Sequence, residues 1–188
     1  MERKREQALI RLAQRGDTQA FAELYRAYVD NIYRYLYFRV NAVPVAEDLT
    51  ADVFMKALEG LPGYQERETP FLGWLYRIAH ARLIDYYRRS RHTDHHEDID
   101  AIELGTTHDL DASLMFEHQS GHMRAALRTL TDEQQQVIIL RFVEGRSIEE
   151  TADLLGKTEG AIKTMQHRAL QSLARALQQQ GFKRDDVL

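Results

Sequence analysis

The sequence predicts an all-α protein: two small helical domains joined by an acidic flexible linker, with a helix-turn-helix in the second domain. Three observations lead to this fold class. Apolar residues recur at three- and four-residue steps through both ends of the chain, charge falls into three blocks, and two capping boxes open helices near the C-terminus. No stretch alternates apolar and polar residues as a half-buried β-strand does.

The bulk composition limits the classes of protein to consider. The 188 residues suffice for one or two domains with their own cores. The chain has no cysteine, which excludes disulfides and thiolate metal sites and fits a reducing compartment. The charged N-terminus is not followed by an apolar signal-peptide core, and no apolar run approaches the length of a membrane span. We therefore expect a soluble, cytoplasmic protein.

The charge distribution predicts the domain boundaries. Residues 1–91 hold 15 Lys and Arg against 12 Asp and Glu, whereas residues 122–188 hold 10 against 9. Between them, residues 92–121 hold 8 acidic residues and neither Lys nor Arg. This segment also loses the helical periodicity, as linkers do. We expect one domain over 1–91, an acidic linker over 92–121 and a second domain over 122–188.

Three helices are expected in the first domain. The first carries an apolar stripe of Phe21, Leu24, Tyr25, Tyr28, Ile32, Tyr35 and Leu36. The second starts near Val45 and stops at the breakers of residues 60–63. The third follows a loop over residues 64–69, with Thr69 as its cap and Pro70 at its first position, and ends in the basic run 88–91.

Local sequence signals in the second domain predict a helix-turn-helix. A capping box at Thr131–Gln134 opens one helix, and a second at Ser147–Glu150 opens the first helix of the motif. In that helix, Ile148, Thr151, Ala152 and Leu155 are expected to face inward. Gly156 provides the turn, and the final helix runs from about Glu159 to Gln179.

The second helix of such a motif enters the DNA major groove, and residues near its N-terminus reach base edges. The candidates for contact with duplex bases or phosphates are Lys157, Thr158, Glu159, Gly160, Lys163, Thr164, His167 and Arg168. A helical bundle with a solvated basic face is the alternative. The capping box, the Leu-Gly turn, and small residues at Ala152 and Gly160 favour DNA binding.

The third helix of the first domain interleaves aromatic and basic residues. It carries Trp74, Tyr76, Arg77, His80, Arg82, Tyr86, Tyr87, Arg88, Arg89 and Arg91. That mixture suits single-stranded DNA, because bases stack on rings while cations follow the backbone. The alternative for Trp74 is a place in the core, and the two interpretations stay open for that residue.

Two acidic clusters are candidates for other sites. Asp48 and Asp52 lie one helical turn apart beside Glu47, either as an exposed acidic face near a helix start or as a docking face for a basic protein. The histidines of the linker, at 92, 95, 96 and 108, alternate with Asp and Glu but match no standard zinc spacing. We expect no metal and no cofactor.

With these motifs in order, the chain resembles the bacterial RNA polymerase sigma factors of the extracytoplasmic-function (ECF) group. The resemblance rests on Gly16-Asp-x-x-Ala-Phe-x-x-Leu-Tyr25, Ala46-Glu-Asp-Leu-Thr-Ala-Asp-Val-Phe54, Pro70-Phe-Leu-Gly-Trp-Leu-Tyr-Arg-Ile-Ala79, Asp85-Tyr-Tyr-Arg-Arg89, Leu127-x-x-Leu-x-x-x-Gln134 and the helix-turn-helix. The chain departs from the family pattern in two places: Ala81 replaces a common Asn, and Met165-Gln166 replaces a common Arg-Leu.

The resemblance implies a non-enzymatic factor that binds core RNA polymerase and directs promoter-specific initiation. Glu47, Asp48, Asp52 and Phe54 would dock on the β′ clamp helices, with the β flap as a further contact. The downstream promoter box would be melted and held by Tyr64, Arg67, Trp74, Arg77, His80, Arg82, Arg88, Arg89 and Arg91. The last helix would read the upstream box as duplex, the acidic linker would thread through polymerase channels, and an anti-sigma factor would hold the protein inactive.

Two other functions remain as alternatives. A transcription regulator that binds duplex DNA alone would explain the helix-turn-helix but neither the acidic linker nor the aromatic-basic helix. A metal-dependent hydrolase built on the His/Asp segment would lack an ordered scaffold there.

Overall fold

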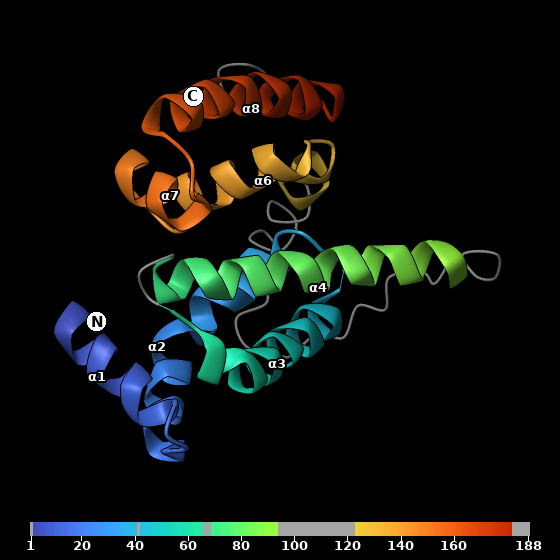
Figure 1. Ribbon diagram of the computed structural model, residues 1–188. Helices are drawn as coiled ribbons and strands as arrows, with labels where there is room; N and C mark the ends of the chain where they lie inside the picture. Colours follow the sequence, from blue (N-terminus) through green and yellow to red (C-terminus); the bar gives the residue numbers. More distant parts are fainter. Residues whose placement is uncertain (1, 41, 66–68, 94–122, 182–188) are drawn as a thin grey trace, which may run out of the picture.

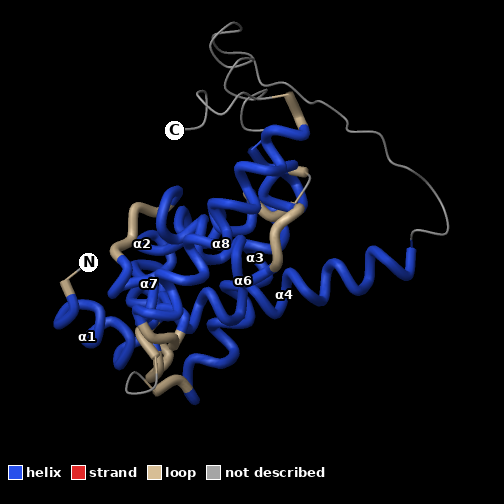
Figure 2. Tube along the Cα trace, turned by 90° about the horizontal axis from the view of Figure 1, so that it is seen from above, coloured by secondary structure: helices blue, strands red, loops and turns tan. Residues whose placement is uncertain are grey.

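A computed structural model describes residues 2–40, 42–65, 69–93 and 123–181 of the chain. All regular structure in these ranges is helical, and Figure 2 shows no strand among them. The all-α fold class is therefore confirmed. No helix in the described ranges combines the length and the apolar character that crossing a membrane requires.

The N-terminal domain contains α1 (Arg3–Ala13), α2 (Thr18–Tyr37), α3 (Val43–Gly60) and α4 (Phe71–Thr93). α2 begins where Asp17 Oδ1 accepts hydrogen bonds from the backbone N–H groups of Gln19 and Ala20, at 2.9 and 3.1 Å. α3 begins close to the expected position. It ends in a 3-10 turn, Leu61–Gly63, at the predicted breakers.

The start of α4 differs from the prediction. Pro70 is not the first helical residue, because its carbonyl accepts the first helical hydrogen bond from the N–H of Trp74 at 2.9 Å. Thr69 does not cap the helix, since its buried hydroxyl has no hydrogen-bond partner. Its backbone carbonyl instead accepts from the Tyr64 hydroxyl at 2.8 Å, which ties the two ends of the loop together.

The C-terminal domain contains a short helix over 123–128, α6 (Asp132–Ile138), α7 (Ile148–Leu155) and α8 (Glu159–Gln179). A π-helical turn, η2 (Ile139–Val143), continues α6. Both predicted capping boxes are present, with Thr131 and Gln134 at α6 and Ser147 and Glu150 at α7. The predicted bounds of α8 agree with the structure.

The two domains pack on each other. In Figure 1, α8 is outermost, α6 and α7 lie beneath it, and α4 lies beneath them on the side of the N-terminal domain. The core of the N-terminal domain includes Ile139 and Leu140 from η2 and Leu154 from α7. A second buried cluster joins α8 to α6 through residues such as Ile138 and Ala169. The C-terminal domain therefore shares apolar surface with its neighbour.

Candidate nucleic-acid interface

The helix-turn-helix is shaped by local contacts. The Ser147 hydroxyl accepts from the Glu150 N–H at 3.0 Å, and the Glu150 carboxylate accepts from the Ser147 N–H at 2.7 Å. That second bond lowers the pKa of the Glu150 carboxyl. Gly156 adopts a left-handed conformation with φ 63°, which ends α7 and turns the chain. Thr158 then caps α8, because its hydroxyl accepts from the Ala161 N–H at 3.2 Å.

α8 presents most of the predicted duplex-contacting residues to solvent. Lys157, Thr158, Glu159, Gly160, Lys163, Thr164, His167 and Arg168 are all exposed. Lys163 is paired with Glu159 at 3.2 Å, one turn earlier on the helix, and Lys157 is paired with Glu133 of α6 at 2.9 Å. Residues 160, 163, 164 and 167 share one helical face, as a groove-binding row requires.

The family departure at Met165-Gln166 is explained by inward-facing side chains. Met165 packs against the small buried cluster of Val137, Ala152 and Ile162. The Gln166 side-chain carbonyl accepts a hydrogen bond from Arg141 Nε at 2.9 Å. Arg141 also donates to the backbone carbonyl of Arg146, next to the start of α7. This arginine therefore links η2, the entry to α7 and α8, a role that the sequence analysis did not identify.

The aromatic residues at the start of α4 form a stacked group. Tyr64 lies 4.8 Å from Trp74 and 5.4 Å from Phe71 between ring centroids. Tyr64 is buried and Trp74 is half-buried against the domain core, and the rim of the Trp74 ring lies against Gly60. In this conformation the two rings support the loop between η1 and α4.

The basic residues of α4 are distributed over different faces. Arg77 and Arg88 are exposed, whereas Arg82 is half-buried. Arg82 and Arg88 share Asp85, at 2.6 and 3.0 Å. Arg89, also exposed, donates to the carbonyl of Asp85 at 3.4 Å. The predicted contacts Arg67 and the Arg91 side chain lie outside the described residues.

α3 carries the acidic face. Glu47 and Asp48 are exposed, and Asp52 is half-buried, 3.8 Å from Arg82. Phe54 is buried and is not exposed on this face. Its ring packs edge-on against the ring of Tyr25, with 4.8 Å between the ring centroids.

Exposed apolar side chains near this face were missed by the sequence analysis. They are Tyr25, Met55 and Leu58, exposed by 41, 60 and 47%. Met55 follows Asp48 and Asp52 at helical spacing, so the acidic face also has an apolar part. A search for unburied apolar residues on the polar side of α3 would have found it.

A metal site finds no support in the described ranges, because they contain no group of three or more His, Asp or Glu placed to hold an ion. The linker histidines at 92, 95, 96 and 108 lie outside the residues whose side chains are described.

Comparisons with known proteins establish the family. The Sigma-70 region 2 profile matches residues 24–93, and the Sigma-70, region 4 profile matches residues 126–175. The ECF RNA polymerase sigma factor SigD of Mycobacterium tuberculosis is 32% identical over 178 residues, which cover 92% of this chain and 84% of SigD. The chain belongs to the ECF group of RNA polymerase sigma factors. This family is not one of enzymes, as the sequence analysis expected.

Two further comparisons place this sigma factor among its relatives. The ECF RNA polymerase sigma factor BldN of Streptomyces coelicolor is 38% identical over 178 residues, covering 90% of this chain but 64% of BldN, so the chain spans less than two thirds of that relative. The sigma factor RpoE from Bartonella quintana, solved with the anti-sigma factor NepR, has a TM-score of 0.61 and 23% identity, covering 86% of this chain and 98% of RpoE. This structural similarity supports the two-domain helical fold described above for this chain.

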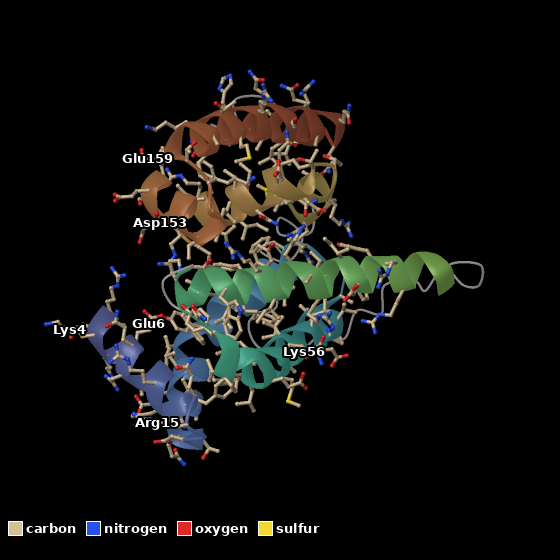
Figure 3. The ribbon with its side chains drawn as sticks, in the orientation of Figure 1. Lys4, Glu6, Arg15, Lys56, Asp153 and Glu159 are labelled. Atoms are coloured by element: carbon tan, nitrogen blue, oxygen red, sulfur yellow. The ribbon has the colours of Figure 1, made fainter. Side chains whose placement is uncertain are left out.

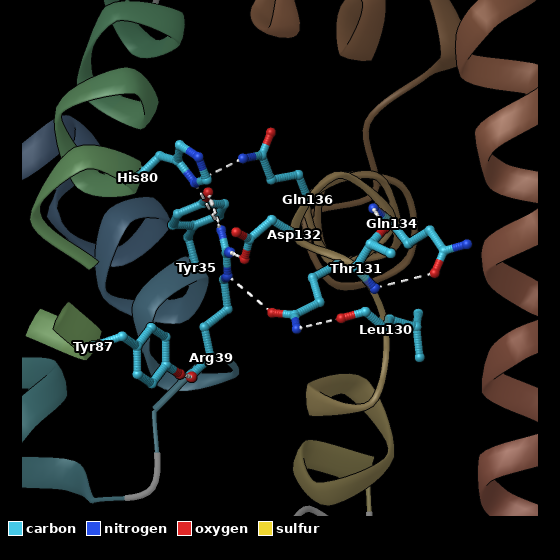
Figure 4. Close-up of polar contacts among 10 residues, drawn as sticks. Tyr35, Arg39, His80, Tyr87, Leu130, Thr131, Asp132, Gln134 and Gln136 are labelled. Atoms are coloured by element: carbon cyan, nitrogen blue, oxygen red, sulfur yellow. Dashed lines mark hydrogen bonds and ion pairs between the residues drawn. The ribbon is translucent and has the colours of Figure 1, made fainter. Parts of the chain in front are cut away.

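The contact between the two domains of this sigma factor centres on a buried arginine (Figure 4). Arg39, just after α2, has no solvent exposure. It reaches Asp132 Oδ1 at 2.5 Å and the Gln135 side-chain oxygen at 3.0 Å, both on α6. Within its own domain it donates to the Tyr35 hydroxyl at 2.5 Å. A fully buried guanidinium is thus balanced by a carboxylate from the other domain.

A second polar contact lies at η2. Glu144, whose side chain is 1% exposed, accepts from Arg34 Nε at 2.7 Å and Nη2 at 3.1 Å, and also from the side-chain amide of Asn31. The geometry with Arg34 is the two-pronged arrangement that favours arginine over lysine. The Tyr76 hydroxyl lies in the same region, is buried and has no hydrogen-bond partner; burial raises its pKa strongly, and Glu144 adds to the effect.

Proposed function

We propose that this chain is a dissociable specificity subunit that binds core RNA polymerase and selects promoters. α8 reads the upstream box as duplex, and α4 with the preceding loop melts the downstream box and holds its unpaired bases. The observation that carries the proposal is the exposed row on α8, presented by a capped, glycine-closed helix-turn-helix in an ECF-family chain.

The upstream contact is supported by the chemistry of α8. Lys163, Thr164 and His167 offer hydrogen-bonding side chains along one face, and Arg168 adds a positive charge beside them. Base-edge contacts from such residues select sequence, whereas contacts to phosphates set the position of the helix. We assign base reading to the row that includes Lys163 and Thr164, and phosphate contact to Arg168 and Lys157.

The downstream contact is supported by α4. Arg77, Arg88 and Arg89 are exposed cations along one helix, and Arg77 lies one turn beyond Trp74, which stacks with Tyr64. Cations that follow a backbone and rings that meet bases are the usual components of single-strand binding. We propose that Arg67, His80, Arg82 and Arg91 complete this surface.

We propose that the face of α3 with Glu47, Asp48, Asp52 and Met55 docks on the β′ clamp helices. Phe54 would support it from beneath, because the side chain is buried against Tyr25. A rim of carboxylates around an exposed apolar side chain is a typical docking surface for a basic partner. The domain over residues 122–188 would contact the β flap, and the linker over 92–121 would run through polymerase channels.

An anti-sigma factor is proposed as the regulator, since the structural relative RpoE was solved with one. Because core polymerase and promoter DNA are its partners, we place the protein in the cytoplasm.

The test is binding to purified core RNA polymerase, followed by transcription from templates with randomised promoters. The Asp48→Arg/Asp52→Arg double variant is expected to lose polymerase binding at least tenfold, because two attractive charges become repulsive. Glu149→Arg/Asp153→Arg makes the same charge change on exposed residues of α7 and should bind as the parent does. Undiminished binding by the α3 variant would remove that face. Tight promoter binding without polymerase would favour an ordinary regulator.

A further inference from the structure

The solvent-facing side of α8 begins with two side chains of opposite charge. Glu159, Lys163 and His167 follow one another at four-residue steps, so they are neighbours on one helical face. Glu159 lies at the start of the helix (Figure 3). Lys163 Nζ lies 3.2 Å from Glu159 Oε2, and the two side chains are 60 and 54% exposed. A charged donor and a charged acceptor therefore lie side by side where a helix-turn-helix contacts base edges.

The next polar side chains on this face are uncharged and already make hydrogen bonds. The Thr164 hydroxyl donates to the Gly160 carbonyl at 3.0 Å, which leaves the hydroxyl its lone pairs for a base. The Gln171 side-chain nitrogen lies 3.0 Å from His167 Nε2. Because an amide nitrogen donates, Nε2 accepts and the proton of the neutral ring is on Nδ1. The charged contacts of this face thus come from the ion pair.

The ion pair can exchange its partners at little cost. Glutamate four residues before lysine is the favourable order on a helix, yet an exposed pair contributes little to stability. Base edges can therefore separate the two head groups, provided that each finds a new partner. The carboxylate needs a donor, since a carboxylate without one loses its water and gains no hydrogen bond. The ammonium group needs acceptors beside that donor.

Base pairs differ in whether they offer this combination in the major groove. Cytosine presents its N4 amino donor, and the paired guanine presents two acceptors, O6 and N7. In an A·T pair, the adenine N6 donor lies between two acceptors, adenine N7 and thymine O4. Those acceptors repel the second carboxylate oxygen, and the thymine methyl group lies next to the charged groups. A carboxylate beside an ammonium group is therefore complementary to a C·G pair.

We propose that Glu159 and Lys163 together select one C·G base pair of the upstream box. The Glu159 carboxylate accepts from cytosine N4, and the Lys163 ammonium group donates to the paired guanine. This inference rests on the proposed function and deepens it, because it assigns a base identity to one contact of α8. Glu159 rejects base pairs without a well-placed donor, since its carboxylate would then face acceptors. It also keeps Lys163 from turning to phosphates, which carry no sequence information.

Promoter selection tests the assignment. Templates randomised over the upstream box are transcribed by core RNA polymerase with the full-length factor. The parent should prefer C·G at one position by about tenfold. Glu159→Gln should change the preferred pair at that position to A·T, because glutamine pairs with adenine N6 and N7. Glu159→Ala should remove the preference there, and both variants should retain the preferences at the other positions.

Glu149→Gln is the matched control. It makes the same change in the first turn of α7, at an exposed carboxylate that also lies near a helix N-terminus. Both changes remove one negative charge from the helix-turn-helix and weaken the same kind of interaction with a helix dipole. Glu149→Gln should nevertheless leave every base preference as it is in the parent. A change of base identity in Glu159→Gln alone therefore reports base reading and not general charge.

Modified templates test the two contacts one at a time. N4-methylcytosine at the selected position places a methyl group on the donor, and 7-deazaguanine removes one acceptor. N4-methylcytosine should weaken promoter binding by the parent about tenfold and have no effect on Glu159→Ala. 7-Deazaguanine should weaken binding by the parent and have no effect on Lys163→Ala. A residue that only stabilises the helix would not show this pairing of variant and modified base.

The outcomes separate the inference from the proposed function. Equal preferences in the parent and in Glu159→Gln would overturn the inference, and so would a parent that is insensitive to N4-methylcytosine. In either case the factor still selects promoters, and the proposed function stands. A parent that initiates equally from all templates would instead contradict the proposed function, because α8 would then read no upstream base.

Discussion

α8 and α4 are both proposed to bind DNA, yet they are placed very differently. The inner face of α8 packs within its own domain, and its outer face is open to solvent (Figure 1). α4 packs on α2 and α3 and is also covered by α7. The duplex-reading surface is therefore complete within one domain, whereas access to the single-strand surface depends on how the two domains are arranged.

Because of this difference, duplex recognition and single-strand binding should respond to substitutions in different parts of the molecule. Changes within the C-terminal domain should alter which duplex is read and leave the single-strand surface intact. Changes at the contact between domains should alter access to the single-strand surface and leave the recognition row on α8 intact.

The largest effect is expected from Gly156→Val. The left-handed conformation at φ 63° is strained for a β-branched residue, at a cost of about 2–3 kcal/mol. The turn that orients α8 should distort, lowering the thermal midpoint and weakening upstream duplex binding by more than about tenfold. Gly156→Asn should largely retain both properties, because asparagine tolerates this conformation and places a Cβ against Arg77 Nη2, at 3.3 Å, just as valine does. Equal losses in both variants would show that the conformation is not the cause.

A smaller effect is expected from Gln166→Leu. The change leaves Arg141 Nε without its acceptor, which costs about 1–2 kcal/mol and loosens the attachment of α8. Upstream base preference should broaden in a randomised-promoter selection, while the salt dependence of binding stays the same, since phosphate contacts are untouched. Gln166→Glu keeps an acceptor and should preserve the preference. Unbroadened preference in Gln166→Leu would assign Arg141 a purely structural role.

The smallest effect is a pH dependence of the domain contact. Burial, and then the charge of Arg39, lower the pKa of His80 below its ordinary 6.5, while Asp132 opposes the shift. Tyr35 and Gln136 are the other polar groups around it. The open chain therefore takes up a proton first as the pH falls, so the closed contact is stable above pH 6.5 and weakens below it.

The chain has no cysteine, so dyes can be attached at Lys56→Cys and Asp153→Cys, which lie on different domains (Figure 3). Energy transfer between these dyes should decline from pH 7.5 to pH 5.5, by at most about tenfold in the closed-to-open ratio per pH unit. His80→Gln removes the titrating group and should flatten the profile. A variant profile as steep as that of the parent would assign the titration to another residue.

The helix-turn-helix was predictable because its determinants are close in sequence. The capping boxes at Ser147–Glu150 and Thr131–Gln134, the turn at Gly156 and the extent of α8 all depend on residues within one or two turns. The row from Lys163 to His167 followed from the same register. Its role in reading DNA stays a prediction.

The contact between domains was not predictable from such signals. Leu154 was not among the residues expected to face inward, because the apolar stripe of α7 was assigned to its own domain. Arg39 is buried by a partner 93 residues away in sequence, and nothing in its neighbourhood indicates that. The prediction that Thr69 caps α4 was wrong for a related reason. Tertiary packing around Tyr64 engages the backbone carbonyl of Thr69 and leaves the Thr69 hydroxyl unpaired.

The ion pair between Arg39 and Asp132 joins two halves of one chain, and that has a consequence for dosage. An intramolecular contact does not weaken on dilution and is not saturated when more of the protein is made. Any ligand that requires the open form binds with its intrinsic dissociation constant divided by the open fraction. A closed state favoured 99 to 1 would thus lower apparent affinity about 100-fold at every expression level. The concentration of the opening ligand, and not that of the factor, would then set the fraction engaged.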